Sequence, residues 1–281
     1  MKSKLRVNIE ILIDLLLVLI SLPNTLKSLF KFNRKVSDFS SIGFNLEAFE
    51  DIYKLGKLAT DRGEKIEIPI RGSYYKLSTT SGAELWAQTS KDNKGIGLHP
   101  GFNGDCVIKV KASPFLESTR LSILDGYYDC WLITDDQDYP LLFESPNFYQ
   151  TSVSRSEVIA EAQVTAFAKE VKIFSSEEER DKDEIWGLWA TQSFTPSGKF
   201  SPNDDESFVQ HPTAIFSGYV RKIELKRNEI TNNKFYHLIV ESLSASYDVV
   251  IDPSLLRSEP QIGNILSGQF YLSGKIISID S

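Results

Sequence analysis

Alternating apolar and polar positions predict β-strands along most of the chain beyond residue 64, because a strand with one buried face alternates in this way. An extended segment is expected at 65–77. In the first half we then expect strands at 84–88, 106–112, 127–134, 139–144 and 158–174. In the second half we expect strands at 185–191, 214–225, 235–243, 247–252 and 265–279. The pattern predicts a mainly β protein.

Two segments have the spacing of a helix instead. Residues 45–61 carry apolar side chains three and four positions apart, and Gly63 follows as a stop signal. The second segment is the apolar run at 9–22, which is too short to cross a membrane and contains two acidic residues. At 100° per residue its apolar side faces away from those acids. The residues of that side are Ile9, Ile13, Leu16 and Ile20.

Three interpretations of the amino-terminal segment stay open. Its apolar side could pack against a protein partner or a second copy of the chain. It could rest on a membrane surface with its basic flanks near lipid headgroups. It could also be a cleaved signal, although no small-residue cleavage site follows the run. We therefore expect a cytoplasmic protein, with membrane association or export as alternatives.

The second half of the chain repeats landmarks of the first half at offsets of 103 to 112 residues. The paired landmarks are Trp86 with Trp189, His99-Pro100 with His211-Pro212, Tyr139 and Pro146 with Tyr247 and Pro253, and Gln163 and Lys169 with Gln269 and Lys275. This order predicts an internal repeat. The expected units are a helix at 1–36, a connector with a short helix at 37–72, repeat 1 at 73–174, a charged linker at 175–184 and repeat 2 at 185–281.

Each repeat contains about five expected strands, several of them long, with glycines inside strand patterns where a barrel would bend. This arrangement resembles the oligonucleotide/oligosaccharide-binding (OB) type of small barrel. The resemblance implies two tandem five-stranded OB-like barrels and a ligand cleft in each. The stretch 263–276 also resembles the ends of uncharacterised bacterial proteins, which implies no activity.

The charge of the chain bears on the kind of partner it binds, and its two cysteines bear on the compartment in which it works. The formal charge of −7 combines +5 over residues 1–36 with −12 over residues 37–281. An acidic body repels phosphate backbones, so nucleic-acid binding by the body is disfavoured, although a local basic groove remains an alternative. Cys106 and Cys130 are interpreted as buried thiols in a reducing compartment, with a disulfide between neighbouring strands as the alternative.

Candidate chemistry is sparse, because the chain has three histidines and neither a G-x-S-x-G nor an H-E-x-x-H motif. We expect no catalytic residue, no cofactor and no metal. His99 and His211 are interpreted as parts of the shared fold. The acidic run at 135–138 lacks the spacing of a calcium loop and is interpreted as a turn.

Aromatic side chains on the second long strand of each repeat are the candidate ligand or partner surface, although alternation places half of them in the core. They are Tyr127, Tyr128, Trp131, Phe235 and Tyr236. We expect a non-enzymatic binding or scaffold protein that associates with other proteins, assisted by the amino-terminal helix. The alternatives are an oligonucleotide or small ligand in the barrel clefts, and an unrecognised hydrolase.

Overall fold

The protein is mainly β in its computed structural model, with 50% of the described residues in strands and 14% in helices. The structure describes residues 36–115, 122–135, 137–151, 157–200, 209–243 and 245–280. Strands in these ranges form two sheets, which we call the small sheet and the large sheet. Ile9, Ile13, Leu16 and Ile20 lie outside the described residues.

The small sheet follows a short helical region. A 3-10 turn, η2 (Ser40–Ile42), precedes α3 (Phe49–Arg62). The Asp51 carboxylate accepts a hydrogen bond of 2.9 Å from the backbone N–H of Ala48 and so caps the start of α3. The helix ends before Gly63, as expected. The strands β1 (Glu64–Ile68), β2 (Gly72–Ser78), β3 (Ala83–Ser90) and β4 (Gly95–Phe102) then pair antiparallel in chain order.

The large sheet holds the other described strands in the order β11-β12-β8-β5-β6-β7-β13-β10-β9. Its first-repeat strands are β5 (Ile108–Phe115), β6 (Tyr127–Leu132), β7 (Tyr139–Glu144) and β8 (Val158–Phe174). Its second-repeat strands are β9 (Ser193–Thr195), β10 (Thr213–Arg227), β11 (Lys234–Glu241), β12 (Ser246–Ile251) and β13 (Ile265–Ile279). Short 3-10 turns, η3 (Phe148–Gln150) and η6 (Pro253–Leu255), follow β7 and β12.

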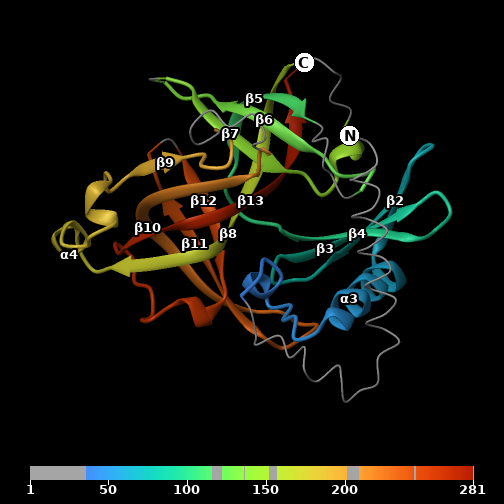
Figure 1. Ribbon diagram of the computed structural model, residues 1–281, viewed down its shortest axis with the longest axis horizontal. Coiled ribbons are helices and arrows are strands. Elements are labelled where there is room, and N and C mark those ends of the chain that lie inside the picture. The colour runs from blue at the N-terminus through green and yellow to red at the C-terminus, as the bar shows by residue number, and fades with distance from the viewer. Residues whose placement is uncertain are drawn as a thin grey trace.

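The two longest strands, β8 and β13, are shared between the repeats (Figure 1). They pair antiparallel with each other, β8 also pairs with β5 and β12, and β13 also pairs with β10 and β7. Within the described part of the chain, β5, β6, β7, β13 and β8 close one ring of pairings, and β10, β11, β12, β8 and β13 close a second. Neither repeat forms its ring alone.

The register between β8 and β13 is close to symmetric. Thr165 pairs with Ser273, and Phe167 pairs with Tyr271. Gln163 and Gln269 are separated by an offset of 106. Adding this offset to position 165 gives 271, and subtracting it from position 273 gives 167, so the first pair becomes the second. The arrangement is therefore close to unchanged when the two strands are exchanged.

Two expectations about the repeat are wrong in their detail. Trp86 and His99 lie on β3 and β4 of the small sheet, whereas Trp189 and His211 lie outside strands, so these landmarks are not equivalent positions. The strand expected at 185–191 is instead a 3-10 turn, η4 (Trp186–Leu188). It follows α4 (Glu177–Asp181), which lies in the expected linker. The Asp183 carboxylate accepts hydrogen bonds from the N–H groups of Ile185 and Trp186, and these bonds favour a turn over a strand.

Apolar side chains of the described residues form three clusters, of which the smallest contains Ile68, Tyr74, Trp86 and Leu124 and the other two hold the sheets. One fills the large sheet and includes Val110, Phe143, Phe216 and Leu272. The other joins α3 and the small sheet to the large sheet, through Ile42, Leu85, Phe102, Phe167 and Phe235. No helix in the described ranges is long and apolar enough to cross a membrane.

Candidate functional site

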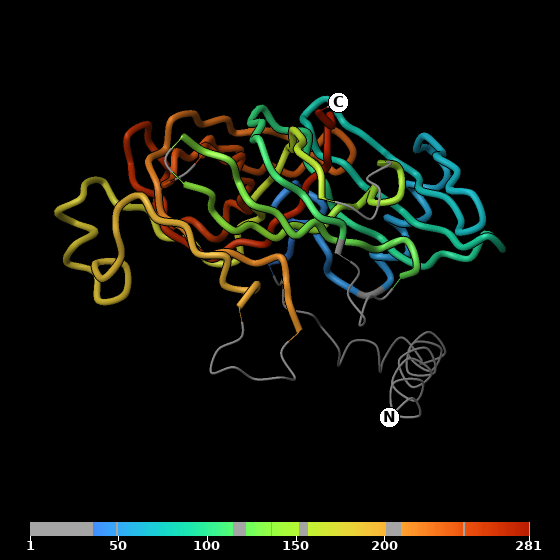
Figure 2. Tube along the Cα trace, turned by 90° about the horizontal axis from the view of Figure 1, so that it is seen from above, coloured from blue at the N-terminus to red at the C-terminus, as the bar shows by residue number. Residues whose placement is uncertain are grey.

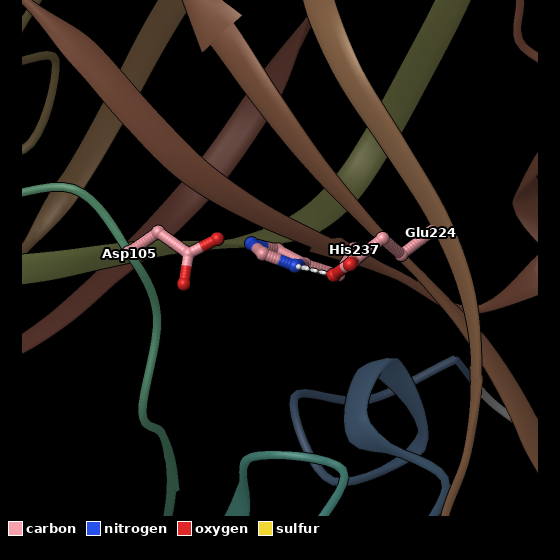
Figure 3. A group of neighbouring side chains, drawn as sticks. All are labelled: Asp105, Glu224 and His237. Atoms are coloured by element: carbon pink, nitrogen blue, oxygen red, sulfur yellow. Dashed lines mark hydrogen bonds and ion pairs between the residues drawn. The ribbon is translucent and has the colours of Figure 1, made fainter.

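A group of polar side chains meets where the connection between β4 and β5 passes the strands β10, β11 and β12. Asp105 lies on that connection, Glu224 on β10 and His237 on β11 (Figure 3). One potential ligand atom from each of the three lies within 4.8 Å of the others. Carboxylate and imidazole groups at this separation are the residue types that hold zinc and related ions.

The His237 ring is fixed from both sides. Its Nε2 atom lies 2.7 Å from Asp248 Oδ1, and its Nδ1 atom lies 3.0 Å from Glu224 Oε2. Asp248 is fully buried and also accepts hydrogen bonds of 3.0 and 2.7 Å from the backbone N–H groups of Asp105 and Cys106. These bonds tie the β4–β5 connection to the large sheet.

Lysine side chains neutralise the two outer carboxylates. Lys222 Nζ lies 2.7 Å from Asp105 Oδ2 and 3.2 Å from Glu224 Oε1, and Lys226 Nζ lies 3.1 Å from Glu224 Oε2. The hydrogen bond with His237 is the largest influence on Glu224, and together with the two lysines it lowers the pKa of this carboxyl to about 2. Negative charge at this site is therefore already balanced by the chain itself.

This geometry favours a partly exposed ion-pair cluster over an open metal site. Figure 3 places Asp105 and Glu224 toward opposite ends of the imidazole, and each ring nitrogen faces a carboxylate oxygen. A divalent ion bound here would have to displace the ammonium group of Lys222 and free one ring nitrogen as a ligand. The cluster instead has the form of a clamp between the β4–β5 connection and the second repeat.

A second histidine is placed in the same way. His99 on β4 lies between two carboxylates, with Nε2 at 3.0 Å from Asp125 Oδ1 and Nδ1 at 3.2 Å from Glu144 Oε1. Burial alone would lower the pKa of His99, but the two carboxylates outweigh it and raise the pKa to about 10. An imidazolium ion therefore joins the small sheet to the large sheet at neutral pH.

The aromatic side chains predicted as a binding surface separate into core and surface. Tyr128 and Phe235 are fully buried and cannot contact a ligand, which corrects the prediction for these two. Tyr127 and Tyr236 are half-buried. Trp131 is 43% exposed, and Lys199 Nζ lies 5.2 Å from its ring centroid. Trp131 is the most exposed of the five, and the ammonium group of Lys199 lies over its ring.

A surface groove of ≈ 300 Å³ lies beside the connection to β5. Its lining residues are Cys106, Val107, Ile108, Lys109, Leu132, Ile133, Ala245 and Ser246. Both cysteines are free thiols. Burial, together with the charges of Asp248 and Asp105, raises the pKa of Cys106 to about 12, so this thiol is a poor nucleophile at neutral pH.

The most exposed apolar side chains near α4 were missed, because residues 185–191 were expected to form a core strand. The segment around α4 projects from one end of the molecule, shown in yellow in Figures 1 and 2. We call residues 175–192 the projection. On it Ile185 is 65% exposed, Leu188 is 85% exposed and Trp189 is 37% exposed.

The projection is held in shape by a buried charge. Arg180 is 1% exposed and donates hydrogen bonds of 2.8 and 2.9 Å to the backbone carbonyls of Trp189 and Ala190. A guanidinium group buried in this way fixes the loop that carries the apolar side chains.

Residues of both histidine clusters are far apart along the chain, and sequence reasoning did not group them. The only sequence signal was the rarity of histidine; His99 was interpreted as part of the shared fold, and His237 was not linked to any acidic residue. Comparison of this chain with protein-family models, with curated proteins and with solved structures returned no match.

Proposed function

We propose that this chain is a non-enzymatic binding protein that associates with another protein chain through the projection. The observation that carries the proposal is an exposed apolar surface, made of Ile185, Leu188 and Trp189, on a loop that Arg180 holds rigid. Exposed apolar groups gathered at one place are typical of protein interaction sites. Aromatic and apolar anchors on a pre-formed loop also lose little conformational freedom on binding.

The charges around the projection indicate the kind of partner. The projection carries six acidic residues and two basic ones, and one of the basic residues is the buried Arg180. We call the exposed acidic residues of the projection, which include Glu178 and Glu184, its acidic rim. This rim repels anionic lipid headgroups and nucleic acids. It favours a protein partner with an apolar surface and basic residues around it.

Photo-crosslinking in the native cell tests the association. A photo-reactive phenylalanine analogue replaces Leu188 in the full chain, and a matched control carries it at Ile70, which is 89% exposed on the β1–β2 turn. We expect a protein adduct from position 188 that is absent at position 70 and is lost when Ile185→Asp is added. Equal labelling at both positions, or none at either, would overturn the proposal.

An oligonucleotide or another stacking ligand is the second candidate, and Trp131 favours it. We propose that the two rings of strands correspond to OB-like barrels, whose ligands stack on aromatic side chains beside basic groups. Trp131 on β6, with Lys199 beside its ring, is such a pair. The acidic body weakens this candidate relative to a protein partner.

A mobility-shift titration with single-stranded DNA and RNA tests the second candidate. Binding that weakens in salt and is lost in Trp131→Ala, while Leu188→Asp leaves it unchanged, would establish it. The absence of any shift at low salt would remove it.

A further inference from the structure

The projection and the amino-terminal segment of the chain are complementary in charge and in polarity. The projection presents apolar side chains within an acidic stretch of six carboxylates and two basic residues. Residues 1–35 carry seven basic residues and two acidic ones, and their longest apolar run is at 9–22. The projection and the amino-terminal segment therefore carry opposite net charges, and both contain apolar residues that could pack together.

We propose that the occupant of the projection is the amino-terminal segment of a second copy of this chain. This inference rests on the proposed function and names its partner. Leu188 and Ile185 would contact the apolar residues Ile13 and Leu16 of that segment, and the exposed Glu178 and Glu184 would face its basic residues Lys27 and Lys31.

Association of two copies would bury more surface than a single contact at the projection does, and a stable interface needs this larger area. The tip of the projection offers only three exposed apolar side chains. A stable interface buries about 800 Å² on each partner, which is more than three side chains supply. When two copies exchange segments around a two-fold axis, the same contact is made twice and the buried area doubles.

The acidic residues of the projection are exposed enough to take part. Glu178 pairs at its surface with Lys182, and its side chain is 83% exposed. Glu184 is exposed as well. Asp183 pairs with Lys172 on β8 and is mostly covered, so it belongs to the support of the loop rather than to its rim.

Sedimentation of the full chain tests the proposal through complementation of two variants. We expect the wild-type chain to form a dimer, and Leu188→Asp and Leu16→Asp each to weaken it by at least about tenfold, the factor that burial of one leucine is worth. A 1:1 mixture of these two variants should form a heterodimer that is weaker than the wild-type dimer but tighter than either variant alone, because one of its two contacts is intact. Ile70→Asp, at the exposed β1–β2 turn, leaves the dimer unchanged.

A charge exchange provides the matched test of the rim. Glu178→Lys with Glu184→Lys weakens the dimer, and adding Lys27→Glu with Lys31→Glu restores it. Restoration by an unrelated substitution of equal charge, Lys109→Glu with Lys234→Glu, would contradict the pairing.

Failure of this inference can be told apart from failure of the proposed function. A wild-type chain that stays monomeric, or a dimer lost in Leu188→Asp but kept in Leu16→Asp, overturns the amino-terminal segment as the occupant. The projection then remains a docking surface if position 188 still crosslinks to a different protein. Loss of that crosslink overturns the proposed function itself.

Discussion

His99 Nδ1 lies 3.2 Å from Glu144 Oε1, across the boundary between the small and the large sheet. The two residues come from β4 and from the end of β7, and Asp125 closes the other side of the ring. The side chains of all three are at most 15% exposed. The charge of one histidine therefore adds an ion-pair contact to the apolar core that joins the two sheets.

Replacing His99 by glutamine should lower the free energy of unfolding by about 3–5 kcal/mol near pH 6, because two buried carboxylates lose their cation. Urea unfolding followed by tryptophan fluorescence measures this change. His211→Gln is the matched control, since His211 is exposed ahead of β10 and should change stability little. Equal effects of the two substitutions would contradict a stabilising ion pair between His99 and its two carboxylates.

The same pair predicts a loss of stability at alkaline pH. The pKa of His99 in the folded protein is raised to about 10 from an ordinary value of 6.5. Its contribution is therefore present in full below pH 6.5 and is lost as the pH rises toward 10. We expect wild-type stability to fall across this range and the His99→Gln protein to show a smaller fall. Parallel curves for the two proteins would refute this assignment.

Asp248→Asn should destabilise the protein by about 3–5 kcal/mol, because this buried carboxylate is the shared acceptor for His237 and two backbone N–H groups. Asp105→Asn is the control. Its side chain is 54% exposed, so its ion pair with Lys222 should contribute less than about 1 kcal/mol. Thermal unfolding of the two variants at one pH compares them directly.

The lowered pKa of Glu224 predicts how the free energy of unfolding changes at acid pH. Its pKa in the folded protein is lowered to about 2 from an ordinary value of 4.5, chiefly by the hydrogen bond with His237. The stabilising contribution is present above pH 4.5 and is lost as the pH falls toward 2. The difference in stability between wild type and Glu224→Gln should therefore shrink as the pH is lowered. A constant difference would show that the charge of Glu224 has no part in it.

Arg180→Lys should loosen the projection without unfolding the sheets. Lysine cannot donate to the carbonyls of Trp189 and Ala190 with the forked geometry of a guanidinium group. Hydrogen exchange of the amides at 185–191 should become faster, while β8 and β13 keep their protection. Lys182→Met, which alters an exposed neighbour, provides the control.

Native Cys106 should alkylate slowly at pH 8. Its pKa of about 12 lies above the ordinary value of 9, which reduces the thiolate fraction roughly a thousandfold. Cys130 is fully buried and should react more slowly still. Iodoacetamide labelling with mass spectrometry, with and without urea, measures both. Rapid native labelling of Cys106 would show that the thiol is not buried against Asp248.

Long strands were predictable because their alternation persists over many residues. The bounds expected for β7, β8 and β13 agree with the structure, and the short helix ends before Gly63 as predicted. The strand predicted at 185–191 was wrong. Its aromatic and apolar residues suit a strand, but Asp183 and Arg180 hold the segment as a turn through contacts that alternation does not reveal.

The distribution of strands between the sheets was not predictable, because it depends on pairings between distant segments. Trp86 and Trp189 share similar neighbours in the sequence, yet only Trp86 lies on a strand. The charged clusters have the same origin. Asp105 and Asp248 are 143 residues apart and are brought together because β5 and β12 both pair with β8.

The sharing of β8 and β13 between the two rings of strands has a consequence for how this chain folds. Each strand has one part that pairs mainly within its own repeat and one part that completes the other, and the register allows the two to be interchanged. A polypeptide of one repeat would leave roughly half of a 17-residue or 15-residue strand as an open edge, which is prone to aggregation. Such a polypeptide could satisfy that edge by swapping strands with an identical molecule. Because each ring contains strands from both halves of the chain, we expect the two rings to unfold together rather than one at a time.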